Sequence, residues 1–187
     1  MSKNRFLSFL GITMLISLTA SESQADGKRV PISFKFAGAF ISNVQQSLAD
    51  GSPTGPSTII HVSAWGFPGG RVLIRGFGGQ SGRSGPGRCP LDGEPAFVVQ
   101  LVENPLVMTF PDLSLLFANL ASGEQGYICI DGAGKNRFEI PLDFIGGRGK
   151  FEGASGGALV KGEAEPIDSR GNFLGETGTL KGLAILP

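Results

Sequence analysis

The side chains that most often carry catalysis are scarce in this chain of 187 residues, which contains one histidine, His61, and two cysteines, Cys89 and Cys129. A serine or cysteine nucleophile needs a base within hydrogen-bond reach, and His61 is the only histidine that can supply one. Ser81 and Ser84 stand in glycine-rich loop sequence rather than on a strand-to-helix elbow. We therefore expect no catalytic residue of this class and interpret His61 as a packed or surface side chain.

Two glycine-rich stretches, residues 147–153 and 76–82, have the composition of phosphate-binding loops. The first has one residue too many for the dinucleotide fingerprint, and strand-like sequence follows both, where a phosphate would need a helix N-terminus. Residues 131–134 lack the alternating acids of a calcium loop, and one histidine cannot build a metal site alone. The sequence predicts neither a cofactor nor a metal ion.

Acidic side chains alternate with apolar ones in the clearest strand-like segment, residues 137–144. Four apolar side chains share one face of this segment, and Glu139 and Asp143 share the other. If the apolar face fills the core, both carboxylates point to solvent, which is where acidic side chains usually lie. We expect the same of Glu163 and Glu165.

Two arginines are the candidates for ligand recognition. Arg71 and Arg75 share a strand face with Leu73 and Phe77, so an inward guanidinium there would anchor a ligand. The ordinary interpretation is that both side chains extend to water. Arg71 and Arg75 are retained as candidate ligand anchors.

The N-terminus has the layout of an export signal. Lys3 and Arg5 precede an apolar run, and small residues stand before a predicted cleavage site after Ala25. The alternative is an uncleaved anchor, for which the run is short compared with the roughly 20 residues of a membrane span. In an exported protein, Cys89 and Cys129 are expected to form a disulfide.

Residues 26–187 have the size of one domain, and their composition is that of an all-β protein. The chain carries 16 basic and 16 acidic residues, so it lacks the excess of positive charge that binding to nucleic acid or an anionic membrane usually requires. About nine strand-like segments separated by turns predict a barrel or a sandwich. Residues 78–95 are expected to form a long irregular loop, and residues 44–48 a helical turn or a loop.

A stretch of six glycines within fourteen residues, 145–158, lies between strand-like segments and predicts a bend in a curved sheet. Residues 145–156 resemble a signature of the allene oxide cyclase-like and dirigent-like barrels, which many exported bacterial proteins of unknown function share. Residues 108–118 resemble the hairpin of these proteins, and residues 173–182 resemble their closing strand. The signature positions are Gly146, Gly147, Gly149, Phe151, Gly153, Ala154 and Gly156.

This resemblance implies an antiparallel closed barrel of eight strands around an apolar cavity, often assembled as trimers. The group includes a cofactor-free cyclase that acts on a fatty-acid epoxide and proteins that steer phenoxy-radical coupling. Its glycines would shape the bend, and Phe151 would fill the core. Arg148 stands where threonine is usual, and no position matches the catalytic glutamate of the cyclase or the dirigent acids, so the resemblance carries the fold and not an activity.

The sequence therefore predicts an exported, secreted or periplasmic β-barrel without enzymatic activity that binds an apolar small molecule. One alternative is a cofactor-free isomerase or cyclase that uses a buried acid, with Glu103, Glu139, Asp143 and Glu163 as candidates. A second alternative is a surface interaction module that acts through the loop of residues 78–95.

Overall fold

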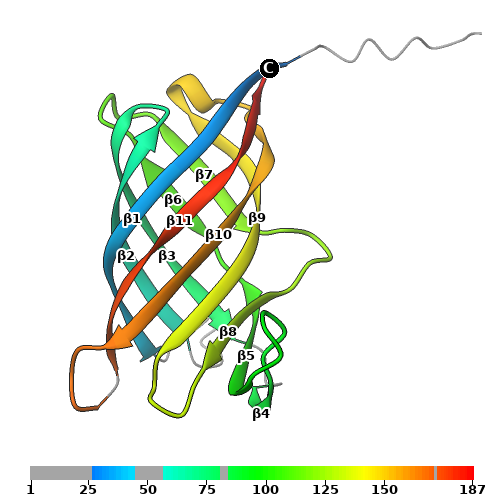
Figure 1. Ribbon diagram of the computed structural model, residues 1–187. Helices are drawn as coiled ribbons and strands as arrows, with labels where there is room; N and C mark the ends of the chain where they lie inside the picture. The colour runs from blue at the N-terminus through cyan, green and yellow to red at the C-terminus, as the bar shows by residue number, and fades with distance from the viewer. Residues whose placement is uncertain (1–26, 45–56, 81–83, 171) are drawn as a thin grey trace, which may run out of the picture.

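The computed structural model describes residues 27–44, 57–80, 84–170 and 172–187, which form an antiparallel sheet of eleven strands (Figure 1). The strands are β1 (Lys28–Val44), β2 (Ser57–Phe67), β3 (Gly70–Gln80), β4 (Gly85–Arg88), β5 (Pro95–Glu103), β6 (Leu106–Thr109), β7 (Leu115–Leu120), β8 (Gly126–Ile130), β9 (Asn136–Arg148), β10 (Ser155–Pro166) and β11 (Phe173–Leu186). A turn of 3-10 helix, η1 (Gly149–Phe151), joins β9 to β10. Within the described ranges, no helix has the length and apolar character that crossing a membrane requires.

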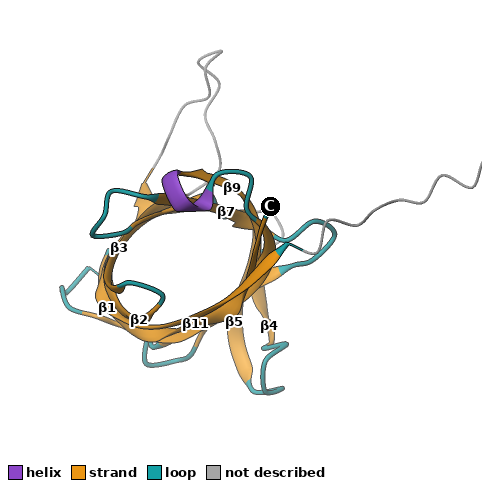
Figure 2. Cartoon of the chain, turned by 90° about the horizontal axis from the view of Figure 1, so that it is seen from above, coloured by secondary structure: helices purple, strands orange, loops and turns teal. Residues whose placement is uncertain are grey.

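Eight of these strands close into a ring, in the order β10, β11, β1, β2, β3, β6, β7 and β9, because β9 also pairs with β10 (Figure 2). The predicted antiparallel barrel of about eight strands is confirmed. In a barrel of this size the interior is just wide enough to be filled by side chains or to hold one small ligand.

Two strands of the wall are interrupted at the same level of the barrel. Asn104 and Pro105 separate β5 from β6, and residues 121–125 separate β7 from β8. Between β3 and β9, the wall is made by β6 and β7 near one end and by β5 and β8 near the other. We call these the η1 end and the β4 end, after the elements that lie there (Figure 1).

Period-2 alternation decides which side chains fill the barrel. On β9, Phe138, Ile140, Leu142 and Phe144 are all buried, while Glu139 and Asp143 lie on the half-exposed outer face, as predicted. On β1, every second residue from Ile32 to Phe36 is buried, and Phe40 continues this row. The inward rows of the strands form one hydrophobic core inside the ring.

Aromatic rings close the η1 end of the barrel. The ring centroids of Phe110 and Phe151 are 4.5 Å apart, and Phe34 meets Phe110 edge-on at 6.1 Å. The Nζ of Lys150 lies 4.6 Å from the centroid of Phe110, at cation–π distance. All three rings are buried, so Phe151 fills the core as expected and this end is sealed.

The glycine-rich stretch reverses the chain, which corrects the interpretation of it as a bend in the wall. Its first residues end β9, its middle forms η1, and Gly156 and Gly157 lie in β10. Gly149 has φ +64°, in the left-handed region, and a Cβ there would lie 2.8 Å from Ser114 Oγ. Glycine is required because the turn packs tightly against the 110–114 hairpin.

Three other expectations need correction. Residues 78–95 are not one irregular loop, because Gly78–Gln80 extend β3 and Gly85–Arg88 form β4, which pairs with β5. β1 reaches Val44, where a helical turn or a loop was predicted to begin, and the sheet has eleven strands rather than about nine. The predicted signal segment, residues 1–25, lies outside the described residues, as do residues 45–48 of the predicted helical turn or loop.

Candidate functional site

The barrel encloses a cavity of about 60 Å³ between the aromatic seal and the β4 end. Its lining is apolar apart from Thr58, Asn104 and Glu176 and the backbone of Gly78. The rings of Phe36 and Phe138 stack on one wall with centroids 6.4 Å apart. A concave apolar space with a few polar groups is the usual form of a small-molecule site.

A larger hollow of about 340 Å³, here called the vestibule, lies at the β4 end. It shares Phe40, Thr58 and Ile128 with the inner cavity, so the two spaces adjoin. Phe97 and Pro166 line the vestibule and are exposed, so it reaches the protein surface. The inner cavity is therefore approached from the β4 end and closed at the η1 end.

Glu176 is the acidic side chain of the inner cavity. It lies on β11 between Leu174 and Leu180 on the row that faces the core, and it is 7% exposed. Its Oε1 is buried and has no hydrogen-bond partner in the part of the chain that the structure describes. Burial disfavours the charged carboxylate and raises the pKa of Glu176 to about 7.

Small residues flank Glu176 on both neighbouring strands. Gly38 of β1 and Ala164 of β10 stand directly opposite it in the strand pairing. Neither carries a polar side chain that can pair with the carboxyl group. The carboxyl group of Glu176 is therefore available to form a hydrogen bond or an ion pair with a molecule in the cavity.

Asn104 lies on the opposite wall, at the interruption between β5 and β6. β11 and β6 are four strands apart in the ring of eight, which places Glu176 and Asn104 across the bore from each other. Asn104 is 1% exposed, and none of the described residues forms a hydrogen bond with its Oδ1. Its backbone N–H donates to Asn119 Oδ1 at 2.8 Å, which holds the residue at the break in the wall.

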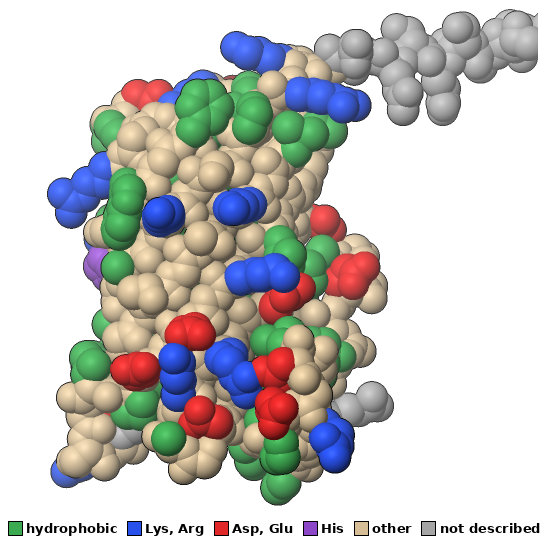
Figure 3. Space-filling view, viewed as in Figure 1, with side chains coloured by type: hydrophobic (Ala, Val, Ile, Leu, Met, Phe, Trp, Pro, Cys, Tyr) green, Lys and Arg blue, Asp and Glu red, His purple; other side chains and the backbone are tan. Residues whose placement is uncertain are grey.

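The four carboxylates considered from the sequence do not line this cavity. Glu139 pairs with Lys161 at 2.7 Å, and Glu163 pairs with Lys135 at 2.7 Å, both on the outer face. The remaining two are Asp143, which accepts a hydrogen bond from the backbone N–H of Ser122, and Glu103, which is half-buried at the end of β5. Figure 3 shows charges of both signs intermixed on the outer wall over β9, β10 and β11.

Arg71 and Arg75, the candidate ligand anchors, do not point into the barrel. Both are exposed on β3, and the alternate residues Val72 and Ile74 fill the core instead. Guanidinium groups stay in water where apolar neighbours can take the inward positions. His61 is likewise exposed, on β2, in agreement with the interpretation of a surface residue.

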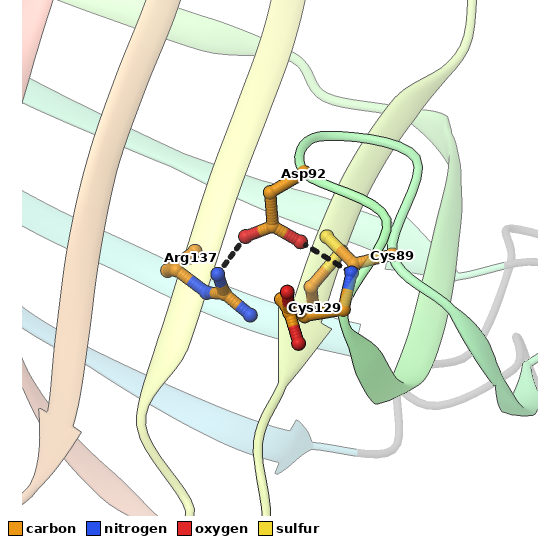
Figure 4. Close-up of a disulfide and its surroundings, with 5 residues drawn as sticks. Cys89, Asp92, Cys129 and Arg137 are labelled. Carbon is orange, nitrogen blue, oxygen red and sulfur yellow. Dashed lines mark hydrogen bonds and ion pairs between the residues drawn. A yellow bond between two sulfur atoms is a disulfide. The ribbon is translucent and has the colours of Figure 1, made fainter.

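The predicted disulfide between Cys89 and Cys129 is present, with both sulfur-bearing residues buried. It ties the turn after β4 to β8 across 40 residues of sequence. Asp92 in the same turn forms an ion pair with Arg137 of β9, beside the disulfide (Figure 4). The disulfide and the ion pair fix the β4 hairpin to the barrel next to the vestibule.

Glu176 and Asn104 were missed by the sequence reasoning. A signal for Glu176 existed, because the residues at every second position from Leu174 to Leu180 share one face of a strand. Glu176 lies on that face between two leucines. Asn104 had no such signal, because its role depends on where the wall breaks.

Within the described residues there is no group of three or more His, Cys, Asp or Glu side chains that could hold a metal ion. No protein-family model matches the chain, and no curated protein matches it. Among solved structures, the pterocarpan synthase dirigent protein aligns with 98% of this chain and 100% of its own, at 13% sequence identity and a TM-score of 0.26. A TM-score this low carries no argument, so the barrel stands on its strand pairing alone.

Proposed function

We propose that the protein binds an apolar small molecule inside its barrel, without converting it. The observation that carries this proposal is the apolar inner cavity, which adjoins a vestibule of about 340 Å³ that reaches the surface. The vestibule lies within the range of roughly 300–1,000 Å³ that is common for ligand pockets. The inner cavity has room for a head group of a few heavy atoms, so the body of the ligand would occupy the vestibule.

A test of this proposal blocks the passage between the two spaces. Ile128→Trp would place an indole where the inner cavity meets the vestibule, and Val107→Trp would place one on the exposed face of β6 as a matched control. Titration with the uncharged fluorophore N-phenyl-1-naphthylamine should show saturable binding to wild type and to V107W, and weaker binding to I128W. Native mass spectrometry after gentle purification should show a bound apolar molecule. Absence of binding in both experiments would refute the proposal.

Glu176 supports a second candidate function, a cofactor-free isomerase or cyclase. A carboxyl group with a pKa of about 7 is half-ionised at neutral pH, which suits a general acid or base. Its place in an apolar cavity would exclude water from such a reaction. Incubation in D₂O with a panel of apolar ketones, followed by NMR, tests for proton abstraction at carbon. Deuterium incorporation by wild type but not by Glu176→Gln would favour the enzyme.

Export also remains a proposal. The disulfide is compatible with an oxidising compartment, because cytosolic thiols are usually kept reduced. Expression of the full chain in a Gram-negative host, followed by intact-mass measurement, should give a mature protein that begins at Asp26. A mass that retains residues 1–25 would contradict cleavage after Ala25.

Assembly into trimers stays a prediction, which sedimentation velocity can test. The role of residues 78–95 as a surface interaction module also stays a prediction.

A further inference from the structure

Resting on the proposed function, we infer that the ligand is a primary amine with an apolar body, whose ammonium group enters the inner cavity between Glu176 and Asn104. Two buried oxygens, Glu176 Oε1 and Asn104 Oδ1, lack hydrogen-bond partners among the described residues and lie on opposite walls of this cavity. A buried acceptor left without a donor costs roughly 1–3 kcal/mol, so a molecule that brings donors to both oxygens is favoured.

The other groups around the cavity also suit a cation. The hydroxyl of Thr58 can accept a third hydrogen bond, and an ammonium group has three donors to give. Phe36, Phe40 and Phe138 present aromatic rings to the same space, and ring faces attract cations. The buried charge of the ligand would therefore be met by opposite charge, hydrogen bonds and aromatic rings, which is the condition for burying a charge.

The same lining disfavours an anionic ligand such as a fatty acid. Among the described residues, no lysine, arginine or histidine lines the cavity or the vestibule. A second carboxylate would lie near Glu176 with no cation to compensate it. An uncharged alcohol has one donor and would leave one of the two orphan oxygens unpaired.

Binding of an ammonium group requires Glu176 to be ionised, so its affinity should depend on pH. The pKa of Glu176 is about 7, so at a lower pH its carboxyl group is protonated and must release a proton when the amine binds. No other titratable group among the described residues lines the cavity. The charged side chains on the two strands that pair with β11 are all exposed: Lys28, Arg29, Lys35, Lys161, Glu163 and Glu165.

Isothermal titration calorimetry of the disulfide-linked protein with decylamine, decan-1-ol and decanoate, at pH 6 and pH 8, tests the inference. Decylamine should bind most tightly at pH 8, and its affinity should fall roughly tenfold at pH 6, as expected for one linked proton. Glu176→Gln should weaken decylamine binding and remove its pH dependence while leaving decan-1-ol little changed.

A second variant keeps both oxygens and reduces the space beside Asn104 Oδ1. A Cβ on Gly78 would lie 3.4 Å from Asn104 Oδ1 with no backbone strain, so Gly78→Ala should weaken decylamine binding, whereas Gly132→Ala, with open space around it, should not. Tighter binding of decan-1-ol or decanoate than of decylamine at pH 8 would overturn the inference and leave the proposed function standing. Failure of all three probes to bind would count against the proposed function itself.

Discussion

The side-chain Oδ1 of Asn119 accepts the backbone N–H of Asn104 at 2.8 Å, and thereby bridges the two interrupted strands of the barrel wall. The same oxygen accepts the backbone N–H of Leu120, also at 2.8 Å. β5 and β6 part at Asn104, and β7 ends one residue after Asn119, so neither amide has the sheet partner that an unbroken strand would give it. One side chain thus replaces the missing pairing and positions a cavity residue.

Asn119→Ala should destabilise the protein, because it removes the acceptor from both amides. Each amide left without a partner costs roughly 1–3 kcal/mol where it cannot reach water. Asn119→Asp is the matched control, since its carboxylate still offers an acceptor at the same place. Urea unfolding followed by circular dichroism measures both variants. Equal loss of stability in the two variants would contradict the bridging role of Oδ1.

Gly178→Ala should also destabilise the fold, by crowding the ring of Phe36. Gly178 stands opposite Phe36 in the β1–β11 pairing, and a Cβ there would lie 2.5 Å from Phe36 Cζ and 2.3 Å from the carbonyl oxygen of Lys161. Overpacking of this kind typically costs about 1–3 kcal/mol.

Gly132→Ala is the control for Gly178→Ala, because no described residue other than its chain neighbours lies within 4 Å of a Cβ at Gly132. Thermal unfolding should lower the midpoint of Gly178→Ala by several degrees and leave that of Gly132→Ala near wild type. An unchanged midpoint for Gly178→Ala would contradict this prediction, because both the ring of Phe36 and the backbone of β10 at Lys161 would then have moved aside without cost.

The strands that alternate cleanly were predictable, and those that do not were missed. Residues 137–144 carry four apolar side chains in strict alternation, and the structure buries that row. β4 has the sequence Gly-Pro-Gly-Arg, which has loop composition, and it is a strand because its backbone pairs with β5. Strand formation there is a tertiary effect that local sequence does not encode.

The site was less predictable than the fold, since it depends on exceptions to the pattern. A carboxyl group at an inward position contradicts the rule that acids lie outside, and the rule was applied to Glu139 and Asp143, where it holds. Glu176 lies among glycines on β11, and these glycines obscure the alternation of apolar and polar side chains along that strand. Residues that break a folding rule without a local reason are often functional ones.

Reduction of the disulfide should destabilise the β4 end of the barrel. The Cys89–Cys129 link closes a loop of 40 residues, for which chain entropy gives roughly 4 kcal/mol as an upper guide. Hydrogen exchange should show loss of protection in β4 and the start of β5. Without the disulfide, the β4 hairpin is held only by its pairing with β5 and by the Asp92–Arg137 ion pair. Protection in β10 and β11 should change less. Uniform loss across all strands would indicate global unfolding instead.

The stability of the protein should fall as pH rises through the window from about 4.5 to about 7, because of Glu176. The ordinary pKa of a glutamate, 4.5, applies to the unfolded chain, and burial raises the pKa of Glu176 in the folded chain to about 7. Between these values the folded state binds more protons than the unfolded state, so stability decreases with rising pH and the loss is complete above pH 7. The shift corresponds to on the order of 3 kcal/mol, at roughly 1.4 kcal/mol for each pKa unit.

Glu176→Gln should remove this dependence, so that the variant is more stable than wild type at pH 8 and no more stable at pH 4. Urea titrations of both proteins at half-unit pH steps isolate the contribution of Glu176 as the difference between the curves. Asp112, whose pKa is lowered by its hydrogen bond from Lys150, contributes stability that is lost only as pH falls below about 4, and it does so equally in both proteins. Parallel curves from pH 4 to pH 8 would mean that Glu176 is ionised in the folded barrel with water or an ion to compensate it. That outcome would also contradict the predicted pH dependence of amine binding.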